Sequence, residues 1–308
     1  MRIAVVGAGA MGGLWAARLR AANNSVTIVD VSGELVSAVR ADGLRVRTGE
    51  SGEVARVEAT SDPFTVGPVD LVFFFIKAQH TPAAAELARP LVGLDTIVVS
   101  QQNGWGNADI LAAVFAPAQI VIGVTYHSAT VLGPGQVAHT GQGPTVVGPY
   151  VDGAPLDRAE RVGAVLSAAG IATTVTPQVK TEVWKKLILN AATLPTAALT
   201  RLCAGNLGQS GPLLELVDAL AAEAVAVARA QGYEIDREER IERIHTVLAG
   251  AGKGKASMLQ DVEVRRKTEV EVINGAVVRA AERTGIEVPL NRAMVALIGG
   301  LERGWRQE

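Results

Sequence analysis

The stretch Gly7-Ala8-Gly9-Ala10-Met11-Gly12 decides the fold of this chain. It follows an apolar run, Ile3 to Val6, and opens an alanine- and leucine-rich stretch that is typical of a helix. A glycine turn between a buried strand and a helix is the fingerprint of a dinucleotide-binding unit. The first glycine permits the turn, the second lets the backbone approach a pyrophosphate, and the third lets the helix pack closely on the strand. The six residues are therefore predicted to hold a pyrophosphate at a helix N-terminus.

An acidic residue follows the glycine turn at the distance that this fingerprint requires. A second apolar run, Val26 to Val29, ends in Asp30, roughly 20 residues after the turn. A carboxylate in that place accepts hydrogen bonds from the ribose hydroxyls of a bound dinucleotide. The alternative, a glycine turn that binds no ligand, is disfavoured by the combination of the turn and the acid.

Composition and charge limit the class of protein. The chain has 308 residues, of which 48% are hydrophobic, and a net charge of −2. These values favour a two-domain globular protein and argue against a partner that is a nucleic acid or a membrane. The longest apolar run, Leu71 to Ile76, is far shorter than the ~20 residues that span a bilayer. The single cysteine, Cys203, fits a reducing compartment, so we expect a cytoplasmic protein without a targeting segment.

Short β-branched runs alternate with helical stretches in the first half of the chain. The predicted strands are Arg2–Val6, Val26–Val29, Leu71–Ile76, Thr96–Ser100, Ile120–Thr125, Thr145–Val147 and Ile171–Val175. The predicted helices are Gly12–Ala22, Val31–Ala41, Pro82–Pro90, Asn107–Phe115 and Asp157–Ala169. Residues 44–58 are predicted to form a small hairpin inserted in the sheet. The alternation predicts an α/β fold with a Rossmann-type, doubly wound, mostly parallel sheet that has helices on both faces.

The pattern changes after Pro177, where the strand-like runs vanish. Helices are predicted near residues 213–228, 241–248, 262–283 and 291–303. We therefore expect a dinucleotide-binding domain at residues 1–177 and an all-α domain, for substrate binding and dimerisation, at residues 178–308. The long apolar helix faces are compatible with a homodimer and equally with burial inside one chain.

Polar residues follow two of the predicted strands. Lys77 comes directly after Leu71–Ile76, and Gln102-Asn103-Gly104 lies just beyond Thr96–Ser100. The carboxyl ends of strands face the ligand crevice in an open α/β sheet, which favours a functional role for both sites. A solvated lysine and an ordinary Asn-Gly turn are the alternatives.

Two further polar clusters lie in the helical half. Lys186 and Asn190 are one turn apart and share one face of a helix that Trp184 anchors among apolar neighbours. Ser257 and Glu269 lie in the other cluster. Taken alone, an exposed lysine, a serine that caps a helix and a surface glutamate would also explain these residues.

The sequence shows no spacing of metal ligands among its four histidines and one cysteine, and no Ser-His-Asp arrangement is visible. We therefore expect no metal. A metal-free enzyme that transfers hydride needs only a cofactor, a proton donor and groups that orient an oxyanion.

These blocks together resemble the ketopantoate reductase (2-dehydropantoate 2-reductase) family over nearly the whole chain. The shared elements are the glycine turn, Phe75-Ile76-Lys77-Ala78, the Gln102 turn, Trp184-Lys185-Lys186-Leu187 with Asn190, and the closing block from Ser257 to Gly275. The resemblance implies a Rossmann domain joined to a helical domain. It also implies reduction of a 2-oxo acid to a D-2-hydroxy acid, as from ketopantoate to pantoate in pantothenate biosynthesis.

The resemblance assigns roles by position. Lys186 matches the catalytic lysine that supplies the proton, and Glu269 matches the acid that assists it. The substrate would be held by residues at three matching positions, Asn103, Asn190 and Ser257. Lys77 and Asn103 match residues that lie near the cofactor.

Two departures from the family pattern bear on the ligands. Family members that use NADPH carry an arginine just after the second strand, where this chain has Asp30-Val31-Ser32. The carboxylate favours NAD(H), with NADP(H) as the alternative, because it would repel a 2′-phosphate. Leu194 stands where the family has an asparagine, so the substrate pocket is expected to be more apolar there.

Three functions follow from these observations. The first is an NAD(P)H-dependent 2-oxo-acid reductase of this family, with a small-molecule 2-oxo acid as its partner. The second is an NAD-dependent D-2-hydroxy-acid dehydrogenase for branched or aromatic substrates, which Asp30 and Leu194 favour. The third, a non-catalytic nucleotide sensor, is disfavoured by the joint presence of Lys186, Asn190, Ser257 and Glu269.

Overall fold

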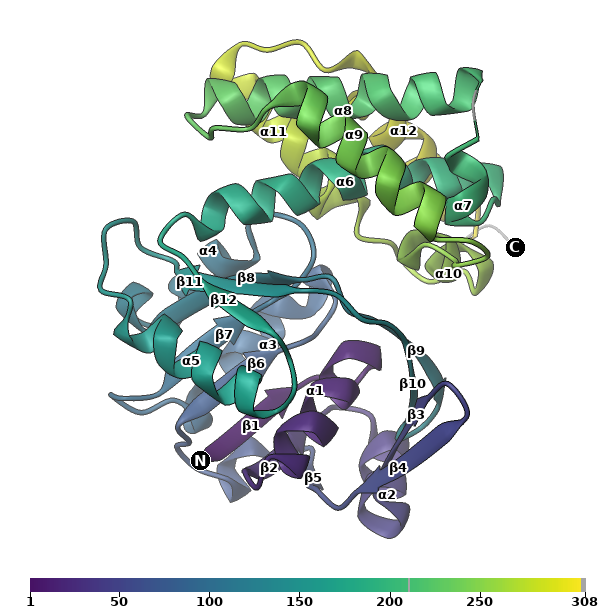
Figure 1. Cartoon of the computed structure of the whole chain (residues 1–308). Helices are drawn as coiled ribbons and strands as arrows, with labels where there is room; N and C mark the ends of the chain where they lie inside the picture. The colour runs from purple at the N-terminus through teal and green to yellow at the C-terminus, as the bar shows by residue number, and fades with distance from the viewer. Residues whose placement is uncertain (210, 306–308) are drawn as a thin grey trace. The chain divides into compact units, whose positions relative to one another are not determined.

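The computed structural model describes residues 1–209 and 211–305. Residue contacts divide the chain into two compact units (Figure 1). Unit 1 comprises Met1–Gln102 and Asn107–Glu182, and unit 2 comprises Asn103–Gly106 and Val183–Glu308. The loop Asn103–Gly106 therefore belongs, by its contacts, to unit 2.

Unit 1 is built on an eight-stranded sheet with the order β12-β11-β8-β7-β6-β1-β2-β5. All neighbouring strands are parallel except β8 and β11, which are antiparallel. The strands are β1 (Arg2–Val6), β2 (Ser25–Val29), β5 (Glu58–Thr60), β6 (Leu71–Phe74), β7 (Ile97–Ser100), β8 (Ile120–Thr125), β11 (Thr145–Pro149) and β12 (Thr173–Val175). The mostly parallel sheet is confirmed.

The order of the strands reverses at β1, from which the chain first adds β2 and β5 and then crosses back to β6, β7 and β8. Right-handed crossovers in both directions place the connecting helices on opposite faces of the sheet. The helices of this unit are α1 (Ala10–Ala21), α2 (Gly33–Asp42), α3 (Thr81–Leu87), α4 (Asn107–Ala112) and α5 (Asp157–Ala168). The doubly wound class predicted from the sequence is confirmed.

A second sheet, with the order β4-β3-β10-β9, corrects the prediction of a hairpin inserted in the main sheet. β3 (Leu44–Thr48) and β4 (Ser51–Ala55) do form a hairpin, but β3 pairs on its other edge with β10 (Gln136–Gly141), which pairs with β9 (Ser128–Gly133). The physical reason is packing on α1, because Gly13 brings that helix against Leu44 of β3 and Val137 of β10. Neither β9 nor β10 was predicted, since neither contains a run of β-branched apolar residues and both are only partly buried.

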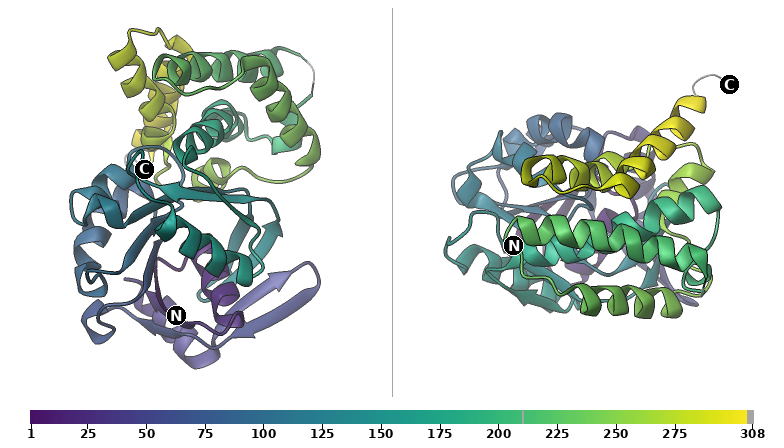
Figure 2. Two further views of the ribbon diagram at one scale, coloured as in Figure 1. Left: turned by 60° about the vertical axis from the view of Figure 1, so that its left-hand side comes forward. Right: turned by 90° about the horizontal axis from the view of Figure 1, so that it is seen from above.

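Unit 2 is helical, and no strand occurs after residue 180 in its described part, as predicted. Its helices are α6 (Val179–Thr200, which begins in unit 1), α7 (Ala204–Leu207), α8 (Pro212–Ala230), α9 (Arg237–Gly250), α10 (Ser257–Glu263), α11 (Asn274–Thr284) and α12 (Pro289–Gly304). α8 and α9 pack against each other, and the right-hand view of Figure 2 shows them side by side. The core of this unit is apolar and centres on α6, with Trp184, Leu187 and Ile188 at most 1% exposed.

One predicted helix, at residues 262–283, is wrong. The chain instead forms α10, a short 3-10 turn at Val270–Val272, and α11. The first break lies just after α10, where Arg265 adopts a left-handed φ of 51° that a helix cannot contain. The break falls in a polar stretch, Arg265 to Glu269, which the prediction of one continuous helix passed over.

Among the described residues, no helix is both long and apolar enough to cross a membrane. The same part of the chain contains no group of three or more histidine, cysteine, aspartate or glutamate residues that could hold a metal ion.

Candidate functional site

The glycine turn has the backbone geometry that its sequence predicts. β1 ends at Val6, Gly7 turns the chain with a φ of +86°, and α1 begins at Ala10 with Gly9 as its N-cap. A side chain on Gly7 would strike Ile76 and Phe75 of the neighbouring chain segment, and one on Gly12 would overlap the carbonyl oxygen of Gly7. Both positions therefore need glycine so that strand and helix can pack closely.

Gly9 needs glycine for a different reason. A Cβ added to Gly9 would meet no protein atom within 4 Å, so packing does not require its absence. The open space lies at the N-terminus of α1, where the first backbone N–H groups of a helix lack helical partners and attract anions. The residues present therefore fit a dinucleotide pyrophosphate at this helix end.

Asp30 is tied directly to the glycine turn. Its Oδ2 accepts a hydrogen bond from the N–H of Ala8 at 2.8 Å, and its Oδ1 accepts one from the N–H of Ser32 at 2.9 Å. Each oxygen keeps further acceptor capacity, which fits two ribose hydroxyls. Arg40, on the next helix, donates from Nε to the carbonyl of Ala59 at 2.7 Å.

Lys77 follows β6 and begins a short 3-10 turn, Ala78–His80. The strand itself ends at Phe74, three residues earlier. Gln102 supports this loop, because its side-chain amide donates to the carbonyl of Ile76 at 3.0 Å and to Thr81 Oγ1 at 2.9 Å. Gln102 thus links the carboxyl ends of β6 and β7 inside unit 1, a supporting role that the sequence did not single out.

Lys186 and Glu269 interact in unit 2. Lys186 lies on α6, and burial lowers the pKa of its ammonium to about 8, while the charge of Glu269 partly opposes that shift by raising the pKa. Glu269 is 7% exposed, so its carboxylate acts through a largely desolvated environment. A lysine with this pKa is mostly protonated at neutral pH and gives up its proton readily, as a general acid requires.

The residue before Glu269, Thr268, anchors the backbone at this point through two hydrogen bonds. Glu302 of α12 accepts hydrogen bonds from both the N–H and the Oγ1 of Thr268, at 2.8 and 2.6 Å. Thr268 is only 2% exposed, so these hydrogen bonds to the charged carboxylate of Glu302 hold a buried residue in place. No sequence signal pointed to Glu302, because it lies 34 residues farther along the chain.

The loop that carries Asn103 docks onto the segment after Glu269. The N–H of Trp105 donates to the carbonyl of Val272 at 2.8 Å, and Gly104, with a φ of +87°, lies so close to Val272 that a side chain would overlap it. The Trp105 ring also packs on Trp184 of α6, with centroids 5.5 Å apart. These contacts place Asn103 in unit 2 together with Lys186 and Glu269.

The remaining predicted substrate residues also lie in unit 2. Asn190, one turn after Lys186 on α6, is 7% exposed, and Leu194, a further turn on, is 9% exposed and belongs to the hydrophobic core. Ser257 is the first residue of α10, but the N-cap is Ala256 and no side chain caps the helix. Capping therefore does not explain this serine.

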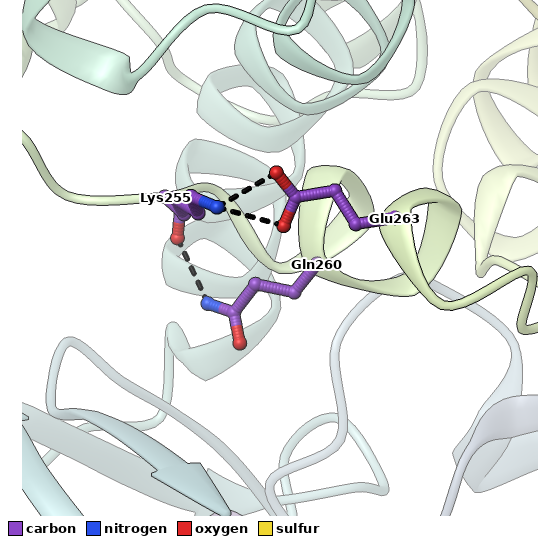
Figure 3. A network of polar contacts seen from close by, with 3 residues as sticks. All are labelled: Lys255, Gln260 and Glu263. Atoms are coloured by element: carbon purple, nitrogen blue, oxygen red, sulfur yellow. Dashed lines mark hydrogen bonds and ion pairs between the residues drawn. The ribbon is translucent and has the colours of Figure 1, made fainter.

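The segment before Ser257 is braced by a small network (Figure 3). The Nζ of Lys255 binds both carboxylate oxygens of Glu263, at 2.7 and 2.9 Å, and the Gln260 amide donates to the carbonyl of Lys255 at 3.0 Å. These partly exposed contacts tie Lys255, two residues before Ser257, to the last residue of α10.

The structure thus gathers the predicted residues into two groups. Unit 1 holds the glycine turn, Asp30 and Lys77, and unit 2 holds the others: Asn103, Lys186, Asn190, Leu194, Ser257 and Glu269.

Comparison with known proteins identifies a family over both units. The model of the family "Ketopantoate reductase PanE/ApbA" matches residues 3–152, and that of its C-terminal part matches residues 178–302. The 2-dehydropantoate 2-reductase of Halobacterium salinarum is 35% identical over 300 residues, which cover 97% of this chain and 98% of that protein.

Two solved structures extend the similarity to three dimensions. The PanE/ApbA family ketopantoate reductase from Ralstonia eutropha JMP134 is 31% identical, with a TM-score of 0.90, over 99% of this chain and 100% of that one. The ternary structure of D-mandelate dehydrogenase with NADH and anilino(oxo)acetate is 26% identical, with a TM-score of 0.94, over 99% of each chain.

Proposed function

Since the chain belongs to the ketopantoate reductase family, we propose that it reduces ketopantoate, a 2-oxo acid, to pantoate with a nicotinamide cofactor. The observation that carries the proposal is the pairing of a desolvated lysine, Lys186, with the buried carboxylate of Glu269. A general acid of this kind is what reduction of a carbonyl requires, since an alkoxide must be protonated as it forms.

In this proposal the proton comes from the Nζ of Lys186. The ammonium first attracts the substrate carboxylate and carbonyl oxygen, then stabilises the negative charge that develops on that oxygen, and finally donates its proton to it. Glu269 keeps the lysine protonated at neutral pH despite its burial, because its charge raises the lysine pKa. Asn103, Asn190 and Ser257 are proposed to hold the substrate.

The glycine turn, Asp30 and Lys77 would hold the cofactor. When bound, a nicotinamide supplies the hydride that is added to the carbonyl carbon of the substrate. The open space at Gly9 would admit the pyrophosphate to the N-terminus of α1, and the carboxylate of Asp30 would accept hydrogen bonds from the ribose.

We further propose that NADH is preferred over NADPH. The carboxylate of Asp30 would repel a 2′-phosphate, and Arg40 is already engaged with the carbonyl of Ala59. Dissociation constants for both cofactors test this preference. Asp30→Ala should narrow the difference between them, whereas equal or tighter binding of NADPH by the unmodified protein would contradict the argument.

A second candidate substrate is a 2-oxo acid with a branched or aromatic side chain. Leu194 supports it because leucine cannot bond the hydroxyl of ketopantoate, and the similarity to a D-mandelate dehydrogenase whose structure holds NADH supports it as well. In this case the reaction would be that of an NAD-dependent D-2-hydroxy-acid dehydrogenase.

Steady-state kinetics separate these candidates. We would measure kcat/KM for ketopantoate and for a panel of branched and aromatic 2-oxo acids, each with NADH and NADPH. The substrate with the highest value identifies the activity. Tight cofactor binding without consumption of any 2-oxo acid would instead support a nucleotide sensor.

A further inference from the structure

Helix α6, which carries Lys186 and Asn190, contains a proline at position 195. Proline has no N–H, so the carbonyl of Ala191, four residues earlier, loses the donor that a helix would normally provide. Ala191 is fully buried, at 0% exposed, so solvent does not replace that donor. The middle of α6 therefore contains a buried acceptor that needs a partner from elsewhere.

The partner is Asn274, the first residue of α11. Its Nδ2 donates to the carbonyl oxygen of Ala191 at 2.9 Å, and Asn274 is itself 0% exposed. The second hydrogen of the same nitrogen goes to Oδ1 of Asn291 at 3.0 Å. Because the carbonyl of Ala191 can only accept, the amide of Asn274 must present its nitrogen there.

The network continues from Asn291 to a charge. Nδ2 of Asn291 donates to Oε2 of Glu223 at 2.8 Å, and the same carboxylate accepts from the N–H groups of Leu290 and Asn291 at the start of α12. The orientation of Asn274 is therefore fixed by groups on α8 and α12. A rotation of its amide would break bonds at both ends.

The hydrogen bond from Asn274 to the carbonyl of Ala191 joins the two segments that carry the proposed proton donor and its carboxylate. Ala191 lies five residues after Lys186 on α6, and Asn274 lies five residues after Glu269. We infer that Asn274 is a positioning residue, which closes the gap left by Pro195 and thereby sets the placement of Lys186 relative to Glu269. The inference of a catalytic effect rests on the proposed function, whereas the bond itself does not.

A double-mutant cycle tests the inference, with Asn274→Leu, Pro195→Ala and the double variant. Leucine is similar in size to asparagine but cannot donate, so Asn274→Leu should lower kcat at least tenfold while KM for the cofactor stays within twofold. Pro195→Ala restores an N–H that can bond the Ala191 carbonyl, and it should remain close to the unmodified enzyme. In the Pro195→Ala background, the loss caused by Asn274→Leu should shrink at least fivefold. Asn274→Leu also removes the hydrogen bond to Asn291, but it does so with and without Pro195, so that loss cancels from the coupling between the two substitutions.

Thr193→Val is the matched control. It removes a side-chain bond of similar length, 2.7 Å, to the carbonyl of Leu189 on the same helix. That carbonyl retains its helical donor, so kcat should change less than twofold.

The same cycle is measured by urea unfolding without any ligand, which separates the two proposals. If the two substitutions are coupled in unfolding but the unmodified protein reduces no 2-oxo acid, the hydrogen bond stands and the proposed function is refuted. Reduction by the unmodified enzyme with additive effects of the two substitutions on kcat and on unfolding would overturn the inference. If Asn274→Leu does not fold, Asn274→Ser takes its place in the cycle, and the same comparison decides.

Discussion

The glycine turn of unit 1 and the lysine site of unit 2 are built in opposite ways. The turn is a single run of residues, and its chemistry comes from backbone N–H groups that glycine leaves accessible. The proposed lysine site would take its side chains from four separate segments, at residues 103, 186–190, 257 and 269. One site is local in the sequence, and the other exists only after the helices have packed.

The difference shows which groups are proposed to carry the function of each site: backbone groups at the turn and side chains at the lysine site. A side chain added at Gly9 should impair the turn, because the open space there is where we propose that the pyrophosphate approaches. In unit 2 the proposed proton transfer depends on the desolvated ammonium of Lys186 and on the charge of Glu269, so loss of either side chain should be damaging. Substitutions can therefore separate cofactor binding from proton transfer.

The largest effect is expected for Lys186→Ala. It removes the proton donor, so kcat for 2-oxo-acid reduction should fall by about 10³-fold, within the range for general acids. The dissociation constant for NADH should change little, since the glycine turn, Asp30 and Lys77 all belong to unit 1. Stopped-flow turnover and fluorescence titration of NADH measure the two quantities.

Lys185→Ala is the control for that substitution. Its side chain points about 100° away around the helix, so the loss of turnover should be minor. A severe loss in Lys185→Ala together with a mild one in Lys186→Ala would reverse the assignment.

Gly9→Ala should show the converse behaviour. No protein atom lies within 4 Å of the added Cβ, so the melting temperature should stay the same, while affinity for NADH should fall at least tenfold because the methyl group occupies the pyrophosphate approach. Gly33→Ala, at another glycine with no atom within 4 Å, should alter neither property. Unchanged NADH affinity in Gly9→Ala would show that the pyrophosphate does not use this turn.

The same contrast explains what the sequence could predict. The strand, the turn and the helix that follows were readable because each residue acts on its immediate neighbours, and Gly7 and Gly12 lie where the pattern requires them. The lysine site could be identified only by resemblance to a family, since Lys186 and Glu269 are 83 positions apart in the chain.

Other features depend on packing that no local pattern encodes. The second sheet forms because β3 and β10, which are far apart in the sequence, both pack on α1. The partner of the Ala191 carbonyl illustrates the limit. Pro195 in a helical sequence predicts a missing donor, but only the fold shows that Asn274 supplies it.

A smaller effect is expected for Leu194→Asn, which addresses the substrate. An asparagine there could bond the hydroxyl of ketopantoate, so the ratio of kcat/KM for ketopantoate over a branched 2-oxo acid without the hydroxyl should rise severalfold. Hydroxyl-reading sites can reach discrimination of about 10⁴. An unchanged ratio would mean that residue 194, which is 9% exposed, does not face the substrate.

The pH dependence of 2-oxo-acid reduction tests the central claim most directly, because it reports the protonation of Lys186 itself. The pKa of about 8 predicts that kcat/KM is constant below that pH and falls tenfold per unit above it, since only the ammonium can donate. Glu269→Gln removes the charge that raises the lysine pKa, so the descending limb should move to lower pH in that variant. A profile that stays flat to pH 10, or a limb that moves to higher pH in Glu269→Gln, would contradict Lys186 as the proton donor.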